Sequence, residues 1–224
     1  MDKRWNSYLT FVMPFLMQIH SASATAGCSI TSISSPSAAT LQVAWDAYPG
    51  AGASYRLNLR AVNSTDTAPV MVVSTATQTL VQGLRPGSYY DVTLKALQYN
   101  MERCRVTQRA LTVPAATQIT TSEALASTSI RFQWSAVTGA DRYFLILELY
   151  TLTQGLVPTR TQVYNSSFTS VTGQVDGLNA STRYNCFVIS YNSAGSGAPS
   201  RSRIVSTRRS ILSWFSHFNG EITE

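Results

Sequence analysis

The stretch Leu84-Arg85-Pro86-Gly87-Ser88-Tyr89-Tyr90-Asp91-Val92-Thr93-Leu94 has a second version further along the chain, Leu178-Asn179-Ala180-Ser181-Thr182-Arg183-Tyr184-Asn185-Cys186-Phe187-Val188. Both versions hold the spacing Leu-x5-Tyr, and every second residue after the tyrosine is apolar. Because side chains of a strand point alternately to its two faces, this period of two predicts a strand with one buried face. The sequence therefore places the same strand in each of two repeated units.

Two further strand patterns precede each of these stretches, in the same order. Segments 40–45 and 129–134 alternate toward a tryptophan, and segments 55–59 and 143–147 begin with a tyrosine. Turn-forming residues separate the strands, at Pro49-Gly50, Pro86-Gly87, Thr138-Gly139 and Ala194-Gly195-Ser196-Gly197. The two units are about 90 residues apart, which is the size of one sandwich domain.

The repeat predicts an all-β chain of two tandem domains, at 27–113 and 116–207, with a tail at 208–224. Many short strands with regular turns are typical of a sandwich or barrel, and no long stretch has the 3.6-residue helical period. The join at 113–117 is short, so we expect the two domains to lie end to end with limited swing.

The order of these features resembles the fibronectin type III pattern: a tryptophan on the second strand, a tyrosine on the third and Leu-x5-Tyr entering the sixth. The resemblance covers 27–207 and implies two tandem seven-stranded fibronectin type III-like (immunoglobulin-like) β-sandwiches. It also implies that Tyr90 and Tyr184 form tyrosine corners, in which the hydroxyl bonds upstream backbone. Trp45 and Trp134 have inward phase and are expected in the cores rather than as ligand platforms. The fold itself says little about function, because it hosts many functions.

The first 26 residues have the pattern of a signal peptide. Lys3 and Arg4 precede an apolar run at 8–19, and 22–26 holds two overlapping A-x-A cleavage sites. The alternative is an uncleaved segment that tethers the protein to a membrane, but the run is shorter than the ~20 residues of a spanning helix and contains Pro14. We therefore expect a secreted, extracellular protein with no membrane span after cleavage.

In an oxidising compartment two of the three cysteines could pair. In the fibronectin type III fold the start of the first strand and the loop before the last strand share one pole, so we expect a disulfide between Cys28 and Cys104. Closing a loop of ~75 residues would contribute roughly 3–5 kcal/mol. Cys186 has inward phase and is expected to be a buried, unreactive thiol. Glycosylation sequons begin at Asn63, Asn165 and Asn179, a number close to chance, so they agree with secretion without proving it.

The sequence gives no support for catalysis, a cofactor or a metal site. The two histidines are His20 and His217, outside both predicted domains, which excludes Ser-His-Asp and Cys-His groups within the sandwiches. The three cysteines are far apart, which disfavours a zinc site. The net charge of +6 is spread thinly, and the arginine groups at 103–109 and 201–209 lack the density that nucleic-acid binding needs. We expect no enzyme and no nucleic-acid partner.

One feature departs from an ordinary solvated sandwich. In the second domain, the outward positions of the third and sixth strands are Phe144, Ile146, Phe187 and Ile189. The equivalent positions of the first domain are polar or charged: Arg56, Asn58, Arg60, Asp91, Thr93 and Lys95. An exposed apolar patch usually marks a contact surface. Three explanations stay open: contact with another molecule, cover by the apolar residues of the tail (Ile211, Leu212, Trp214, Phe215 and Phe218), or side chains that point inward instead.

The sequence thus supports an extracellular protein-binding or adhesion module without catalytic activity. Its partner would be an extracellular or cell-surface protein. The alternative is a structural spacer of a secreted or cell-surface multi-domain protein, in which the sandwiches only set a distance. A patch that binds favours the first hypothesis, and a wholly polar surface would favour the second.

Overall fold

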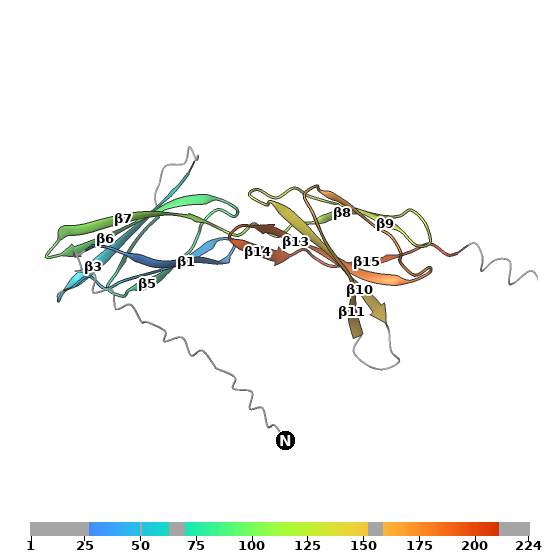
Figure 1. Ribbon diagram of the computed structural model, residues 1–224, viewed down its shortest axis with the longest axis horizontal. Helices are drawn as coiled ribbons and strands as arrows, with labels where there is room; N and C mark the ends of the chain where they lie inside the picture. The colour runs from blue at the N-terminus through green and yellow to red at the C-terminus, as the bar shows by residue number, and fades with distance from the viewer. Residues whose placement is uncertain (1–26, 50, 63–69, 152–158, 211–224) are drawn as a thin grey trace, which may run out of the picture.

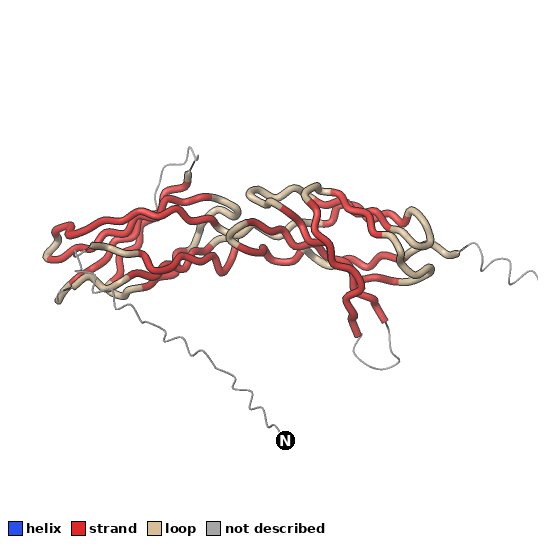
Figure 2. Tube along the Cα trace, viewed as in Figure 1, coloured by secondary structure: helices blue, strands red, loops and turns tan. Residues whose placement is uncertain are grey.

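A computed structural model describes residues 27–49, 51–62, 70–151 and 159–210. Within these ranges every regular element is a β-strand (Figure 2). The strands form two sandwiches that lie end to end along the long axis of the molecule (Figure 1). The all-β prediction of two tandem seven-stranded sandwiches is confirmed. The predicted signal peptide and the apolar part of the tail lie outside the described residues.

The first sandwich is built from seven strands in two antiparallel sheets. One sheet has the order β1-β2-β5 and the other the order β4-β3-β6-β7. The strands are β1 (Ile30–Ser37), β2 (Thr40–Trp45), β3 (Ala53–Ala61), β4 (Val70–Ser74), β5 (Gln78–Val81), β6 (Tyr89–Gln98) and β7 (Met101–Leu111).

The second sandwich repeats this arrangement, with sheets β12-β9-β8 and β11-β10-β13-β14; β15 also pairs with β13. The strands are β8 (Ile119–Ala124), β9 (Ile130–Trp134), β10 (Arg142–Thr151), β11 (Thr159–Phe168), β12 (Thr172–Val175), β13 (Arg183–Asn192), β14 (Gly195–Pro199) and β15 (Arg203–Ser206). Because β14 and β15 both pair with β13 on the same side, they are two halves of one strand position, and the domain has seven positions like the first.

Each sandwich has its own core, made by the inward residues that the alternation predicts. Leu57 and Val92 of the first domain are almost fully buried, as are Leu145 and Val188 of the second. Burial of each such side chain stabilises the fold by about 1.5–3 kcal/mol. Trp45 and Trp134 lie in these cores, 4% and 2% exposed, so their expected structural role is confirmed.

Four tyrosine hydroxyls tie strands to the preceding backbone. Tyr90 Oη accepts a hydrogen bond of 2.7 Å from the amide of Arg85, and Tyr184 Oη one of 2.9 Å from the amide of Asn179. These bonds are the tyrosine corners that the resemblance implies. The tyrosines that begin the third strands do the same: Tyr55 Oη accepts from Tyr48 N at 2.7 Å, and Tyr143 Oη from Val137 N at 2.9 Å. The repeat therefore extends to the hydrogen bonds of both cores.

Two predicted loops are strands in the structure. Cys104 was expected in the loop before the last strand, but β7 already begins at Met101, because Tyr99 and Asn100 make a two-residue hairpin turn with positive φ values of 54° and 59°. The predicted turn at Ala194–Gly197 is also wrong in part. Gly195, Ser196 and Gly197 belong to β14, and the turn is formed by the two residues before them.

The two domains are joined closely by the linker and by two facing turns. Asn192 Nδ2 of β13 donates to the carbonyl of Thr112 at 2.9 Å, and Ser190 Oγ donates to the carbonyl of Ala115 at 2.5 Å. The turns meet at Gly87 and Gly139, where a Cβ on either glycine would collide with backbone of the other domain. Both glycines have positive φ, which favours glycine as well. These contacts fit the expected limited swing.

Candidate functional site

The apolar patch predicted on the second domain is formed by the pairing of β10 with β13. Their antiparallel register sets Phe144 opposite Ile189 and Ile146 opposite Phe187. The alternate residues of the same strands, such as Leu145 and Cys186, belong to the core. The four patch side chains therefore lie together on the outer face of the sheet, and the explanation that they point into the sandwich is excluded.

The patch is closely packed but open on its outer side in the described chain. Ile146 at its centre is 8% exposed, and Phe144, Phe187 and Ile189 are half-buried. A shallow hollow of about 210 Å³ opens there and is lined by Phe144, Ile146, Asn165, Ile189, Tyr191 and Ser196. The tail residues that could cover the patch lie outside the described residues.

Two neighbouring side chains extend the patch beyond the residues that the sequence singled out. Tyr191, 38% exposed, packs edge-on against Phe144 with ring centroids 5.7 Å apart. Ile204 of β15 pairs with Asn185 and is 47% exposed. Continuing the outward alternation of β13 would have found Tyr191. Ile204 could not be placed, because it depends on how the chain resumes pairing after β14.

A polar pair borders the patch on the same face. Asn185 is 2% exposed, and its Nδ2 donates to Oε2 of Glu148 at 2.9 Å. A buried amide needs such a partner, because leaving it unpaired would cost roughly 1–3 kcal/mol. The pair fixes one end of the patch next to Ile146 and Phe187.

On the equivalent face of the first domain, the outward residues of β3 and β6 are polar or charged, and ion pairs hold several of them. Lys95 and Arg105 both bind the carboxylate of Glu102, at 2.9 and 2.8 Å. Hydrogen bonds from Arg105 and Lys95 lower the pKa of Glu102 to about 2. Arg109 pairs with Asp91 at 3.0 Å on the same sheet. The outward side chains of β3 and β6 are thus polar or charged, whereas those of β10 and β13 are apolar. At the edge of the first-domain sheet, Met71 and Val73 of β4 also lie on this outer face, 61% and 67% exposed.

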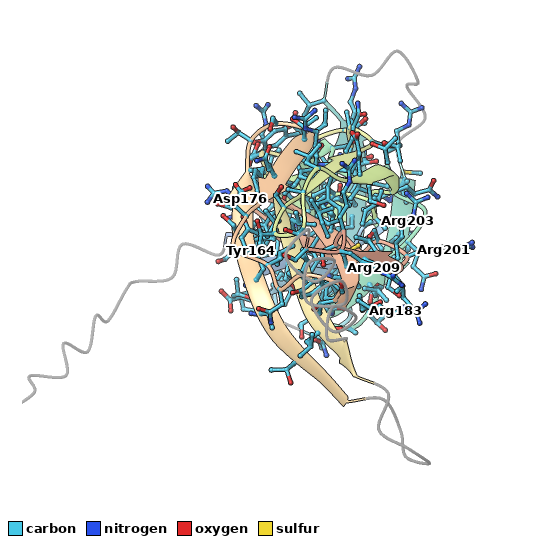
Figure 3. The ribbon with its side chains drawn as sticks, turned by 90° about the vertical axis from the view of Figure 1, so that its right-hand side faces the viewer. Tyr164, Asp176, Arg183, Arg201, Arg203 and Arg209 are labelled. Atoms are coloured by element: carbon cyan, nitrogen blue, oxygen red, sulfur yellow. A yellow bond between two sulfur atoms is a disulfide. The ribbon has the colours of Figure 1, made fainter. Side chains whose placement is uncertain are left out.

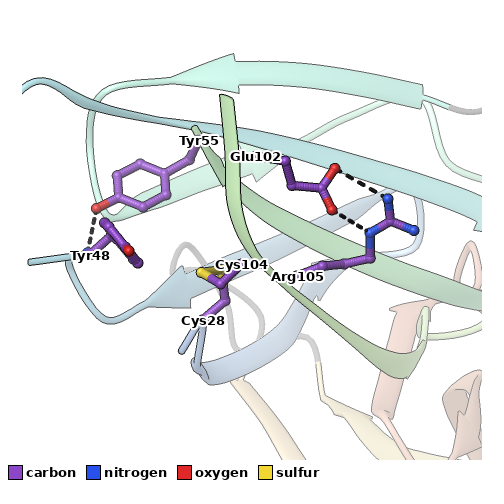
Figure 4. The surroundings of a disulfide bond; sticks show 6 residues. All are labelled: Cys28, Tyr48, Tyr55, Glu102, Cys104 and Arg105. Atoms are coloured by element: carbon purple, nitrogen blue, oxygen red, sulfur yellow. Dashed lines mark hydrogen bonds and ion pairs between the residues drawn. A yellow bond between two sulfur atoms is a disulfide. The ribbon is translucent and has the colours of Figure 1, made fainter. Parts of the chain in front are cut away.

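Cys28 and Cys104 are joined by a disulfide with a Cα–Cα distance of 5.5 Å (Figure 4). Cys28 precedes β1 and Cys104 lies near the start of β7, so the bond ties two strands of opposite sheets at one pole. Both cysteines pack against the core of the first domain. The bond is structural, since neither sulfur is free.

Cys186 is the free thiol of the described chain and is completely buried. Its Sγ donates to the carbonyl of Arg203 at 3.0 Å. Burial raises the pKa of Cys186 to about 12. A thiol in this state is a poor nucleophile, because the thiolate is the reactive form.

No acid, base or metal constellation appears in the part of the chain that the structure describes. None of its His, Cys, Asp and Glu side chains gather in threes as a metal site would need. Arg183, Arg201, Arg203 and Arg209 lie on one side of the second domain, away from Asp176 (Figure 3). Arg203 bonds the carbonyl of Thr120 at 3.3 Å. In the described part of the chain, no helix is long and apolar enough to cross a bilayer.

The sequons occupy different surroundings. Asn165 is exposed on β11 and pairs with Ile146, so it lies at the border of the patch. Asn179 is exposed in the turn before β13. Asn63 lies outside the described residues.

Comparison with known proteins gives structural likeness only. No protein-family model and no curated protein sequence matches the chain. Among solved structures, the chain is similar to a two-domain fibronectin type III segment of chicken tenascin, with 18% identity and a TM-score of 0.42 over 80% of this chain and 98% of that one. It is also similar to domains FN1–FN3 of chicken CNTN1, with 20% identity and a TM-score of 0.42 over 82% of this chain and 67% of that one.

Proposed function

We propose that the protein is an extracellular protein-binding module without catalytic activity. It would hold its partner on the apolar face of β10 and β13. The observation that carries the proposal is the contrast between equivalent strands: the outward residues of β3 and β6 are polar or charged, with Lys95 and Asp91 ion-paired, and those of β10 and β13 are apolar. A sheet face that is exposed only to water is normally polar. The apolar outward residues of β10 and β13 are therefore best explained by contact with another molecule.

The patch has enough apolar area to contribute to binding. Phe144, Phe187 and Ile189 are only half-buried. Completing the burial of each would contribute on the order of 1 kcal/mol, given about 1.5–3 kcal/mol for a full side chain. Tyr191 at the edge offers an aromatic ring with a hydroxyl, the kind of residue that is enriched at interfaces. The partner is expected to be an extracellular or cell-surface protein with an apolar surface of its own.

The disulfide and the signal-like N-terminal pattern support an oxidising, extracellular setting, since disulfides persist there and are rare in the cytosol. The spacing of Cys28 and Cys104 is similar to that of fibronectin type III domain-containing protein 7. The second domain departs from that spacing, because neither Val113-Pro114-Ala115 nor Tyr191-Asn192-Ser193-Ala194-Gly195 contains a cysteine.

The first domain suggests a substitution that tests the patch without disturbing the sheet. Lys95 occupies the position equivalent to Ile189, so a lysine fits this outer face. Ile189→Lys should remove binding and leave the melting temperature nearly unchanged. The measurement is quantitative capture of extracellular proteins by the full secreted chain after enzymatic removal of its N-linked glycans. Lys95→Ala in the first domain serves as the matched control.

The proposal requires a protein captured by the wild type and by Lys95→Ala and lost with Ile189→Lys. If all three chains captured the same proteins, the patch would not be the binding surface.

A second candidate function is a spacer, and the close join between the domains favours it. The hydrogen bonds from Asn192 and Ser190 hold the linker against the second domain, and the turns at Gly87 and Gly139 touch. A fixed angle between two sandwiches suits a rod that sets a distance. This role is compatible with a binding face on one of its units.

A further inference from the structure

Asn165 lies beside the apolar patch, not merely on the same domain. It pairs with Ile146 across β11 and β10, and directly opposed side chains have Cβ atoms about 5 Å apart. Its side chain lines the same hollow as Phe144, Ile189 and Tyr191. A group attached to the Asn165 amide would begin at the edge of this hollow.

The local sequence makes Asn165 an acceptor for such a group. Asn165-Ser166-Ser167 is an N-glycosylation sequon. Asn165 is exposed, and β11 is the edge strand of its sheet, so no described strand lies on its other side. Ser167, two residues on, pairs with Phe144 and is exposed as well. The whole sequon therefore borders the patch.

The hollow suits one face of a sugar ring in its chemistry. It is shallow, with a volume of about 210 Å³, and the surface that lines it is mostly apolar. One face of a pyranose ring is made of C–H bonds, which favour apolar surroundings and the negative face of an aromatic ring. Phe144 and Tyr191 provide two rings that meet edge to face at the hollow.

We propose that Asn165 carries an N-linked glycan whose first sugar covers the hollow, so that occupancy of Asn165 controls access to the patch. In the modification, the amide nitrogen of Asn165 loses a proton and bonds the anomeric carbon of a lipid-pyrophosphate-linked oligosaccharide, and the lipid pyrophosphate leaves. The chain without this glycan has an open patch, and the glycosylated chain has a shielded one. The control of partner binding by this glycan rests on the proposed binding function. The cover of the patch by the glycan does not depend on that function.

The second domain contains a matched control for this proposal. Asn179 is exposed in a sequon of its own, in the turn before β13. Its backbone is held by Tyr184 and Thr207, and its side chain does not line the hollow. A glycan at Asn179 would add the same mass and polarity without covering Ile189 or Tyr191.

The test uses the full chain secreted from glycosylating cells. Enzymatic release of glycans in heavy-oxygen water, followed by peptide mass spectrometry, should mark Asn165 as occupied. Asn165→Gln should then increase the fluorescence of a hydrophobic dye and delay elution from a hydrophobic-interaction column, whereas Asn179→Gln should change neither. Ser167→Ala, which removes the sequon and keeps Asn165, should behave like Asn165→Gln. Adding Ile189→Lys to Asn165→Gln should reverse the gain.

An unmodified Asn165 in the secreted chain would overturn the proposal. So would dye binding that is the same in Asn165→Gln and Asn179→Gln, which is also the result expected if the tail covers the patch. If only the binding function is wrong, the outcome is different. Asn165→Gln would still expose the patch to the dye, but adding Ile189→Lys to that chain would leave its captured proteins unchanged.

Discussion

Replacing Cys28 and Cys104 together with alanine removes the one covalent tie between the two sheets of the first domain. The cysteines are 76 residues apart. The chain-entropy relation then gives a stabilisation of about 4.5 kcal/mol at 25 °C, through the freedom that the bond removes from the unfolded chain. Both sulfurs also pack against the core, so the alanines lose a few contacts besides. A loss of 3–5 kcal/mol is expected.

The second domain makes this prediction specific, because it has a separate core and no disulfide among its described residues. Calorimetry of the secreted chain should show the first-domain transition moving down by about 12–40 °C, at roughly 4–8 °C per kcal/mol for a domain of this size. The second-domain transition should stay nearly in place. The double substitution avoids the free thiol that a single change would leave.

A first-domain transition that moved by only a few degrees would contradict this expectation. It would mean that the bond constrains the unfolded chain little, or that strain in the folded domain cancels the gain. Equal movement of both transitions would refute the assumption that the cores unfold separately.

Two more predictions follow from buried groups and from the join. Burial raises the pKa of Cys186 to about 12, so a thiol reagent at pH 8 should modify it only after denaturation, and rapid labelling of the native chain would contradict this account. Gly87→Ala should loosen the join, since its Cβ would meet the carbonyl of Thr138; small-angle scattering should show a wider spread of interdomain distances. Gly83→Ala is the control, since Gly83 also has positive φ but open space around it, and equal effects of the two changes would show that backbone strain alone is responsible.

The core and the patch were predictable because both depend on strict alternation around anchored residues. Tyr143 and Tyr184 are inward, so every second residue from them is inward, and Phe144 and Phe187 must face out. Register between β10 and β13 then follows from the fold. The alternation gave the outward phase of each strand, and the resemblance to the fibronectin type III fold gave the pairing of the third strand with the sixth.

The hairpin and the last strand were not predictable, because tertiary contacts decide them. Tyr99-Asn100 lacks the Asn-Gly signal of a two-residue turn, so the start of β7 could not be seen. Gly195 and Gly197 are typical of a turn, yet Gly197 stands where the carbonyl of Pro114 leaves no room for a Cβ. Gly197 approaches the linker at Pro114, some 80 residues earlier in the chain. The local sequence around Gly197 cannot predict this close approach of two backbone segments.

The most direct test of the binding surface places a photo-crosslinking residue at Ile189 and, in a second chain, at the equivalent Lys95. Irradiation on cells or in extracellular medium, followed by mass spectrometry, identifies what lies within reach of each position. With the N-linked glycans of both chains removed, we expect an adduct with a separate protein from position 189 and none of that protein from position 95. Adducts from position 189 only with the tail at 211–224, or the same proteins from both positions, would contradict it.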